Sequence, residues 1–418
     1  MSQNRSTSAK VIHGDCVEVM RDLCREHVLV DAVVTDPPYH LASIVSRLGS
    51  PDAAPIQSGA TGAYQRASQG FMGQVWDGGD VAFRVDTWRR VYDVMKPGAH
   101  LVAFAATKGY HRMVCAIEDA GFEIRDMLCW LYGTGFPKSH NMAGEWEGWG
   151  SALKPAVEPI VLAQKPISES SIEANVARWS VGALNIDASR IPVDDAQYAR
   201  NCSGRRGHDK NRERSMDFHL TAGKGSDIGR WPANVLHDGS EEVLEAFAAY
   251  GERGAIAPVH TRSADKFRST YGAFKGNIDE AGSTFRGDAG SAARFFYSSK
   301  ATQGERIFEC RQCGQHRIGK PDCGHDAFRT HPTVKPISLM RWLVEMVTPP
   351  NGLVLDPFAG TGTMAAAARE AGMQSLLIEA DENHVRDIGV RLGLDVTDLL
   401  AAKVAAAPVA QTEQGSLL

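Results

Sequence analysis

Hydrophobic residues in this chain occur in short runs that end at turn residues, with amphipathic stretches between them. The run Val30–Thr35 is rich in β-branched residues and stops at Asp36-Pro37-Pro38, which is typical of a buried parallel strand. Further strands are predicted at residues 10–14, 100–105, 123–131, 159–163, 294–298, 352–355 and 375–379. Helices are predicted at residues 16–25, 86–95, 111–120, 336–347, 363–371 and 382–392. This alternation indicates an α/β fold with a mostly parallel sheet.

Two long stretches interrupt the alternation. Residues 43–80 are rich in Gly, Ser, Ala and Gln, and they predict a long loop that either closes over a bound substrate or is disordered. Residues 166–295 are polar and rich in Gly and Arg, and they predict an inserted module. Disordered tails are predicted at residues 1–9 and 401–418.

The composition, 43% hydrophobic and 23% charged, predicts a soluble globular protein. With 418 residues, the chain is long enough for one large core and a second, smaller module. No apolar run of about 18 residues occurs, so we expect no membrane span. Residues 1–10 lack the apolar core of a secretion signal, and we therefore expect a cytoplasmic protein.

The net charge of −5 provides no general attraction for nucleic acid, so any nucleic acid must bind at a local basic patch. Residues 196–230 contain eight Lys or Arg against four acidic residues. This basic run either contacts a phosphate backbone or forms a solvated loop, and we expect the contact. The candidate nucleic-acid-binding residues are Arg205, Arg206, Lys210, Arg212 and Arg214.

A first candidate site is the tetrapeptide Asp36-Pro37-Pro38-Tyr39, at the carboxyl end of a predicted strand, where open α/β sheets bind ligands. The Asp36 carboxylate and the Pro37 carbonyl could accept both N–H bonds of an exocyclic base amine, so that its lone pair points at a methyl donor. The two prolines restrict the backbone, and Tyr39 offers a flat face on which a base can stack for about 1–3 kcal/mol. The alternative is a plain turn after a strand.

A second candidate site is the segment Asp356-Pro357-Phe358-Ala359-Gly360-Thr361-Gly362-Thr363, which joins a predicted strand to a helix. Its glycines let the backbone pass close to a ligand, and Glu379 at the end of the next strand suits ribose hydroxyls. No Gly-Lys-Ser/Thr follows, so a triphosphate-binding P-loop is not expected. A nucleoside-like ligand that carries a sulfonium fits this turn better than ATP.

These two sites, together with His331-Pro332-Thr333-Val334-Lys335-Pro336, resemble the motifs of the β class of amino-methylating DNA methyltransferases. In that class the catalytic motif precedes the cofactor motif, as it does here, which is a circular permutation of the usual order. The resemblance extends to Gly14-Asp15-Cys16, which lies near the cofactor adenine in such enzymes, and the segment 331–336 would form a wall of the methionine pocket. It spans most of residues 10–165 and 294–395.

The resemblance implies a Rossmann-like methyltransferase sheet, circularly permuted, with S-adenosylmethionine as cofactor, double-stranded DNA as substrate and a homodimer. It implies a catalytic half at 10–165, a target-recognition region at 166–295 that reads the DNA sequence, and a cofactor half at 331–395. The implied cofactor-binding residues are Asp15, Cys16, Asp36, His331, Pro332, Thr333, Lys335, Asp356, Phe358, Ala359, Gly360, Thr361, Gly362, Thr363, Glu379 and Ala380.

The first residue of the tetrapeptide bears on the target base. Asp36 resembles enzymes that methylate adenine N6, whereas Ser is commoner in those that methylate cytosine N4, so a sequence-specific adenine-N6 DNA methyltransferase is expected and N4-cytosine is the alternative. RNA and protein-glutamine methyltransferases usually begin this motif with Asn, and 5-methylcytosine chemistry needs a Pro-Cys pair that is absent. A non-catalytic, zinc-containing DNA-binding protein is the alternative from another class.

The family does not require one further cluster, Cys310-x2-Cys313-x9-Cys323-x-His325 within residues 306–330. Three thiolates and an imidazole would complete a tetrahedral, structural zinc site of zinc-knuckle type, and His316 is a competing fourth ligand. The surrounding residues are polar, so a metal would have to replace a hydrophobic core. The alternative is a loop with three reduced thiols.

Overall fold

The computed structural model describes residues 8–39, 80–133, 135, 139–192, 229–249, 291–299, 302–330 and 334–401. Most of the predicted loop at 43–80 lies outside these residues, as do the five basic candidates between Arg205 and Arg214. The same holds for His331, Pro332 and Thr333 and for most of both predicted tails.

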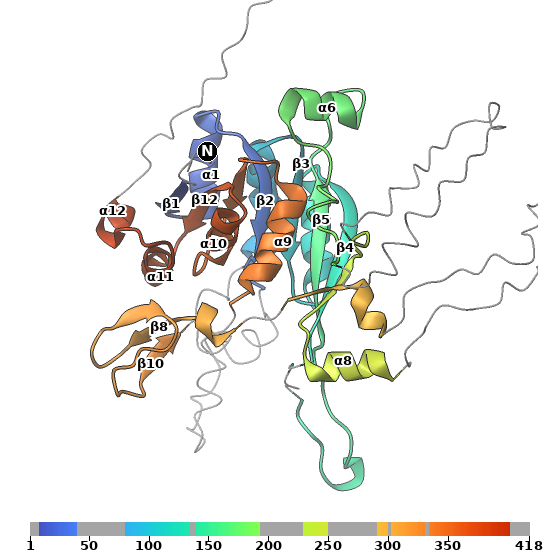
Figure 1. Cartoon of the computed structure of the whole chain (residues 1–418), viewed down its shortest axis with the longest axis vertical. Coiled ribbons are helices and arrows are strands. Elements are labelled where there is room, and N and C mark those ends of the chain that lie inside the picture. Colours follow the sequence, from blue (N-terminus) through green and yellow to red (C-terminus); the bar gives the residue numbers. More distant parts are fainter. Residues whose placement is uncertain are drawn as a thin grey trace, which may run out of the picture. The chain divides into compact units, whose positions relative to one another are not determined.

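In the described residues, strands and helices alternate along much of the chain (Figure 1). The strands are β1 (Ala9–His13), β2 (Val30–Thr35), β3 (Met95–Phe104), β4 (Glu123–Leu131), β5 (Val157–Gln164), β6 (Val235–His237), β7 (Tyr297–Ser298), β8 (Ile307–Cys310), β9 (His316–Ile318), β10 (Phe328–Thr330), β11 (Leu353–Asp356) and β12 (Gln374–Glu379). The α-helices are α1 (Cys16–Arg25), α4 (Val85–Asp93), α5 (Tyr110–Asp119), α6 (Ile172–Trp179), α8 (Glu241–Ala248), α9 (Ile337–Val347), α10 (Thr363–Glu370), α11 (Glu382–Leu392) and α12 (Val396–Ala401). Short 3-10 helices are η3 (Val81–Phe83), η4 (Gly144–Trp146), η5 (Ala292–Phe295) and η6 (Gln303–Glu305).

Among the described residues, nine strands form one sheet in the order β1-β12-β11-β2-β3-β5-β4-β6-β7. The first five of these are parallel to one another, whereas β5 runs antiparallel to both β3 and β4. A second, three-stranded sheet has the order β10-β8-β9 and is antiparallel. The α/β fold with a largely parallel sheet is therefore confirmed, with a mixed half that the sequence pattern did not indicate.

Helices cover both faces of the parallel half of the large sheet. On one face, α1, α4 and α5 pack into a core that includes Met20, Trp88 and Ile117 together with the sheet residues Val33 and Leu101. On the other face, α9 contacts β2 and β3, and α10 packs against α9 and β12 (Figure 1). All six residues of β2 are buried, which explains why its sequence, VDAVVT, lacks a regular apolar and polar alternation.

Most predicted elements are confirmed within a few residues, and 123–131 and 382–392 agree at both ends. The predicted strand at 294–298 is wrong in its first half, because residues Ala292–Phe295 form a 3-10 helix and only Tyr297–Ser298 form a strand. In η5 the Ser291 hydroxyl accepts a hydrogen bond from the Ala293 N–H, a local cap that favours a helical turn over an extended start.

The chain divides into two compact units. The first comprises Met1–Ser189, Asn234–Ser240 and Ser298–Leu418, and the second comprises Arg190–Ala233 and Glu241–Tyr297. In the second unit, the rings of Phe247 and Phe296 lie 5.4 Å apart. The sites described below lie in the first unit. No helix among the described residues is long and apolar enough to cross a membrane.

Candidate functional site

The carboxyl ends of five parallel strands meet at one edge of the large sheet. Asp36 follows β2 there, Asp356 ends β11 and Glu379 ends β12. Because β5 is antiparallel, its first residues lie at this same edge, and the pairing of Phe104 with Ile160 brings Glu158 to it as well. Three acidic strand ends and one acidic strand start therefore share the edge where α/β sheets hold their ligands.

Lys335 lies at the centre of a charged cluster at this edge. Its ammonium group is 2.7 Å from Asp36 Oδ2, 3.2 Å from Glu158 Oε2 and 3.0 Å from the Tyr39 hydroxyl oxygen. The Tyr39 hydroxyl donates to Asp36 Oδ1 at 2.6 Å. The Lys335 side chain is only 6% exposed and also lies over the rings of Tyr39 and Phe104. We call Asp36, Tyr39, Glu158 and Lys335 the charged cluster.

The charges of this cluster stabilise one another. Burial by itself would lower the pKa of the Lys335 ammonium, but the carboxylates of Asp36 and Glu158 outweigh burial and raise that pKa above its ordinary value. Burial and the same two carboxylates raise the pKa of Tyr39 well above its usual range. At neutral pH, Lys335 is therefore positive and Tyr39 remains a neutral hydrogen-bond donor.

A hydrogen bond joins the end of β2 to the end of β11, the strands that carry the two sequence motifs. The Thr35 hydroxyl donates to Asp356 Oδ1 at 2.6 Å, and both side chains are buried. The Phe358 N–H donates to the same oxygen at 3.1 Å. Burial raises the pKa of Asp356 to about 7, although these two hydrogen bonds act to lower it. The tetrapeptide and the glycine turn thus lie side by side, although their first residues, Asp36 and Asp356, are far apart in the sequence.

The glycine turn after β11 needs glycine for its backbone. Gly360 and Gly362 have φ values of 52° and 74°, in the left-handed region that side chains with a Cβ rarely adopt. The Gly360 N–H donates to Glu379 Oε2 at 2.7 Å, and the Asp381 N–H donates to Glu379 Oε1 at 2.8 Å. A Cβ at Gly360 would meet no protein atom within 4 Å, so the turn leaves this side of its backbone open.

The Glu379 carboxylate, at the end of β12, contacts several groups around the glycine turn. Besides the two backbone N–H groups, His384 Nδ1 lies 3.5 Å from Glu379 Oε1. Burial alone would lower the pKa of His384, yet its interaction with Glu379 raises it. The Gly14 N–H donates to the Glu379 carbonyl, and His13 Nε2 lies 3.2 Å from the Ala380 carbonyl. The segment that follows β1 therefore adjoins the end of β12.

Several predicted cofactor-binding residues also stabilise the fold through a helix cap, core packing or hydrogen bonds. The Asp15 carboxylate accepts from the N–H groups of Val17 and Glu18 and so caps α1. Cys16 is buried, and burial raises the pKa of its thiol to about 12. Phe358 packs against the hydrophobic core, and the Thr361 carbonyl accepts from Arg391 Nε at 2.6 Å. Ala359 and Thr363 are buried, which leaves Gly360 as the open point of the turn.

Sequence reasoning missed Glu158, Thr35 and Phe104. Glu158 stands at the beginning of an apolar strand, and a lone acid in that position was the available signal. Its importance depends on the antiparallel direction of β5, which the sequence pattern did not indicate. Lys335 was expected in the cofactor pocket, and the structure places its ammonium group between the carboxylates of Asp36 and Glu158.

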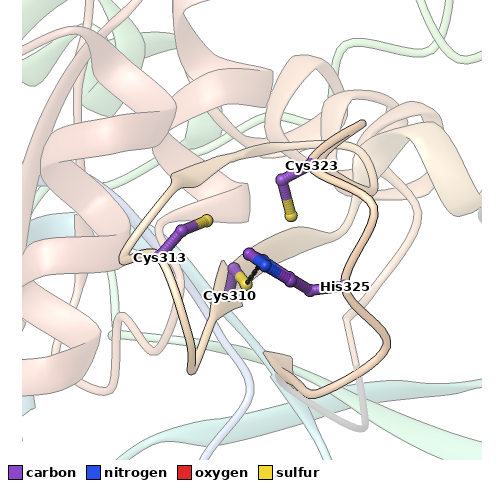
Figure 2. A group of neighbouring side chains, drawn as sticks. All are labelled: Cys310, Cys313, Cys323 and His325. Carbon is purple, nitrogen blue, oxygen red and sulfur yellow. Dashed lines mark hydrogen bonds between the residues drawn. The ribbon is translucent and has the colours of Figure 1, made fainter.

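The cysteine cluster assembles outside this edge. Cys310, Cys313, Cys323 and His325 each offer one ligand atom, and all four atoms lie within 4.8 Å of one another. Figure 2 shows the four side chains pointing toward a common centre, with Cys310 Sγ 3.3 Å from His325 Nδ1. His316, the competing fourth ligand, instead has Nε2 2.6 Å from Asp387 Oδ1.

Comparison with known proteins gives a family for most of the chain. A family model described as DNA methylase, N6_N4_Mtase, matches residues 30–390. The type II methyltransferase M.HindIII of Haemophilus influenzae is 30% identical over 166 residues, which cover 36% of this chain and 49% of that protein. The DNA adenine methyltransferase YhdJ of Escherichia coli is 35% identical over 78 residues, which cover 19% of this chain and 26% of that protein. This chain thus spans about half, or less, of the length of these curated relatives.

Among solved structures, that of M1.HpyAVI aligns with 93% of this chain and 100% of its own, at 12% identity and a TM-score of 0.39. The structure of the cytosine-N4-specific PvuII DNA methyltransferase aligns with 94% of this chain and 92% of its own, also at 12% identity and a TM-score of 0.39.

Proposed function

Since the chain belongs to the N6_N4_Mtase family of DNA methylases, we propose that it transfers a methyl group from S-adenosylmethionine to an exocyclic base amine in DNA. One observation carries this proposal. The charged cluster around Asp36 and the glycine turn around Gly360 lie at one sheet edge, and the hydrogen bond from Thr35 to Asp356 joins them. A base and a methyl donor held at this edge would therefore be neighbours.

The residues present fit S-adenosylmethionine. The left-handed turn at Gly360 exposes backbone on which a ligand can lie, and the Glu379 carboxylate at the end of β12 is suited to ribose hydroxyls. The acidic groups of the edge favour a ligand that carries positive charge, as a sulfonium does. Gly360, Glu379, Asp15 and Asp356 would hold this cofactor, which supplies an electrophilic methyl group when bound.

Asp36 would orient the amine that attacks. Each carboxylate oxygen has a second lone pair beside those that Tyr39 and Lys335 already use, so Asp36 can accept an N–H bond of the target amine. That bond draws the amine nitrogen toward tetrahedral geometry and turns its lone pair toward the methyl group. Transfer would form the N–C bond and break the sulfur–methyl bond, so that the sulfonium leaves as a neutral thioether and the amine gives one proton to solvent. The carboxylates of Asp36 and Glu158 would stabilise the positive charge on the nitrogen until that proton leaves.

Lys335 and Tyr39 would prepare the carboxylates for this role. The Lys335 ammonium lies between the carboxylates of Asp36 and Glu158 and offsets the repulsion between them, and the Tyr39 hydroxyl fixes the rotation of the Asp36 carboxylate. The ring of Tyr39 would stack on a base that has left the duplex. No cysteine nucleophile is needed, because the amine attacks the methyl carbon directly.

We propose adenine N6 as the target, with cytosine N4 as the second candidate. Asp36 at the first position of the tetrapeptide supports adenine by resemblance, and YhdJ, a relative of this chain, is named a DNA adenine methyltransferase. The motif order along the chain supports the permuted β class, and residues 166–295 stand where that class places its target recognition. A homodimer stays a prediction that sedimentation of the purified protein can check.

The decisive experiment expresses the chain in cells that lack other DNA methylation and identifies the modified nucleosides by mass spectrometry. We expect N6-methyladenine with the wild type and a loss of at least about 100-fold with Asp36→Ala, because one preorganised polar group contributes about 10²–10³ in rate. Calorimetry with S-adenosylmethionine supplies the control, because cofactor binding by the variant would separate lost transfer from lost binding or folding. N4-methylcytosine would select the second candidate, and no methylated base would end the proposal.

The recognition region is tested through its salt dependence. Charge reversal at Arg205, Arg206 and Arg212 should weaken DNA binding and reduce the slope of log affinity against log salt by about one for each lost phosphate contact. Reversal at Arg21 and Arg25, which pair with acids on the exposed face of α1, is the matched control. An unchanged slope would show that the basic run is a solvated loop.

A further inference from the structure

The proposed transfer does not use the second cluster of reactive side chains, which lies on the three-stranded sheet. Cys310 ends β8, and Cys313, Cys323 and His325 lie in the loops that follow β8 and β9. In a tetrahedral site with three sulfurs and one nitrogen the ligand atoms stand about 3.5–3.8 Å apart, as follows from Zn–S and Zn–N bonds of about 2.3 and 2.0 Å. The Cys310 Sγ to His325 Nδ1 distance of 3.3 Å is slightly shorter than this, and all four ligand atoms lie within 4.8 Å of one another.

The backbone around the ligands has the turns that such a site needs. The Gly314 N–H donates to the Cys310 carbonyl at 2.9 Å and closes a tight turn around Cys313. Gly314 and Gly324, each next to a ligand, have φ values of 74° and 70°. A Cβ on either glycine would meet no protein atom, so the left-handed backbone is the reason for glycine there.

The segment lacks the apolar core that would otherwise hold these side chains together. Among the residues of 302–330 whose burial is described, only Ile307, Cys310 and Pro321 are buried. Segments shorter than about 40 residues usually need a metal, a disulfide or a larger neighbour to stay folded. Three thiols and an imidazole gathered at one point therefore favour a metal over a satellite core.

The metal chemistry is specific. Three sulfur ligands and one nitrogen ligand favour zinc over oxygen-preferring ions such as calcium or magnesium. Four protein ligands leave no open position for water or substrate, so the ion would be structural. His316 is engaged with Asp387 and not with the cysteines, which assigns the fourth position to His325.

The three-stranded sheet is tied to α11 through one buried carboxylate. The Asp387 side chain, 2% exposed, accepts from Arg329 of β10 at 2.8 Å and 3.1 Å and lies 2.6 Å from His316 of β9. Arg329 also donates to Glu309 of β8 at 2.6 Å. Each strand of the small sheet thus contributes one side chain to the network around Asp387.

Helix α11 also contacts the glycine turn, through Arg391. Arg391 lies four residues after Asp387, so it projects from the same side of α11. Its Nε donates to the Thr361 carbonyl at 2.6 Å, and its Nη2 donates to the Glu305 carbonyl at 3.0 Å. The Glu305 carboxylate in turn accepts from the Ile337 N–H at the start of α9, two residues after Lys335.

We propose that Cys310, Cys313, Cys323 and His325 bind one structural zinc ion, and that this zinc holds the small sheet against α11 and so positions the glycine turn at Thr361. The zinc fixes the strands that present His316 and Arg329 to Asp387. Through Asp387 and Arg391, the packing of α11 then determines where the backbone of residues 359–363 lies.

The metal content of the purified protein tests whether the four residues bind zinc. Untagged full-length protein, purified without chelator, should contain about one zinc per chain by elemental analysis, and so should Cys115→Ser, which changes an exposed thiol on α5 outside the cluster. Cys310→Ser and Cys323→Ser should retain almost none. His325→Gln should weaken zinc retention, whereas His316→Gln should keep it; the reverse result would overturn the ligand assignment.

Because a cysteine variant can fail to fold, the wild type is also tested without mutation. Exchange of the bound metal for Co²⁺ should give sulfur-to-cobalt charge-transfer bands and the intense visible bands of a tetrahedral site. A wild type that contains no zinc and gives no such spectrum with Co²⁺ would overturn the zinc site.

Hydrogen exchange tests whether the zinc positions the glycine turn, and this measurement does not depend on the proposed cofactor. Removal of the metal with a chelator should speed amide exchange in peptides that cover residues 359–363 by about 10-fold, and re-addition of zinc should reverse it. His316→Gln, with zinc still bound, should produce part of the same increase. Unchanged exchange after complete metal removal would show that the zinc site does not position the turn.

Discussion

The charged cluster and the cysteine cluster each gather four polar side chains, the first from distant parts of the chain and the second from residues 310–325 alone, and they hold them differently. Asp36, Tyr39, Glu158 and Lys335 stand on or beside elements of a large sheet that is covered on both faces, and the Lys335 ammonium pairs with both carboxylates. Cys310, Cys313, Cys323 and His325 stand on loops of a small sheet with few buried side chains. The first cluster is complete within the protein, whereas the second has four donors that converge on one point.

This difference shows what a hydrophobic core makes possible. In the large sheet, the buried strands fix the backbone, so a lysine can remain charged between two carboxylates without an added ion. In the small sheet, the backbone has little to fix it except left-handed turns and the contacts with α11. The charged cluster therefore holds its shape through the sheet and its own ion pairs, whereas the proposed zinc would supply that support to the cysteine cluster.

The largest effect is expected from Lys335→Met. Removing one partner of a buried charge network leaves Asp36 and Glu158 uncompensated, and we expect a loss of about 3–5 kcal/mol in the free energy of unfolding, measured with urea at pH 8. Lys96→Met is the matched control. Its ammonium pairs with Asp31 at 2.6 Å but is 27% exposed, and the Asp31 carboxylate keeps a hydrogen bond from the Leu353 N–H at 2.7 Å, so a smaller loss is expected.

A second change identifies the cause of that loss. Glu158→Gln in the Lys335→Met background should restore part of the stability, because it removes one of the two unpaired carboxylates. Equal losses with Lys335→Met and Lys96→Met, or no recovery with Glu158→Gln, would contradict the view that buried charges hold this cluster together.

A smaller effect, dependent on pH, is expected from Asp356→Asn. The folded-state pKa of Asp356, about 7, lies above its ordinary value of 3.8, so the folded protein holds a proton that the unfolded chain releases at lower pH. The stability linked to this proton is full below about pH 4 and is lost as the pH rises through 7. Between pH 5 and pH 8, the variant should gain on the order of 3 kcal/mol relative to the wild type.

Urea unfolding of both proteins at several pH values measures that gain. The Asn side chain keeps an oxygen that can accept from Thr35 and Phe358, so the change removes the titration and little else. A difference between the two proteins that does not vary with pH would show that Asp356 stays ionised at the sheet edge.

The smallest effect comes from a matched pair of glycines, Gly360→Ala and Gly314→Ala. Both glycines have positive φ, 52° and 74°, and neither has a protein atom near its missing Cβ, so each variant should lose about 1–2 kcal/mol of stability from backbone strain alone. Calorimetry should separate them. Gly360→Ala should weaken S-adenosylmethionine binding and leave zinc in place, whereas Gly314→Ala should weaken zinc binding. The same ligand profile for both would erase the distinction between the two regions.

The local elements of this fold were largely predictable. Val30–Thr35 is mostly apolar and ends at turn residues, Gln374–Glu379 has the apolar centre Leu376–Ile378, and Glu382–Leu392 has the period of an amphipathic helix between Asp381 and Gly393. The strand predicted at 294–298 failed because a Ser291 cap favours a helical turn within an apolar run too short for periodicity to decide. In short apolar segments of this kind, the sequence pattern does not determine whether a strand or a helical turn forms.

Sequence alone located the two motifs and the turns that carry them. Asp36-Pro37-Pro38-Tyr39 and the glycine turn at Gly360 follow strands, and the backbone of each turn is set by prolines or glycines within it. Tertiary structure decided which partners these motifs have. Glu158 reaches Lys335 because β5 runs antiparallel, and His325 rather than His316 joins the cysteines because Asp387 on α11 engages His316. Strand direction and the packing of a distant helix are properties of the whole chain, and no local spacing of residues encodes them.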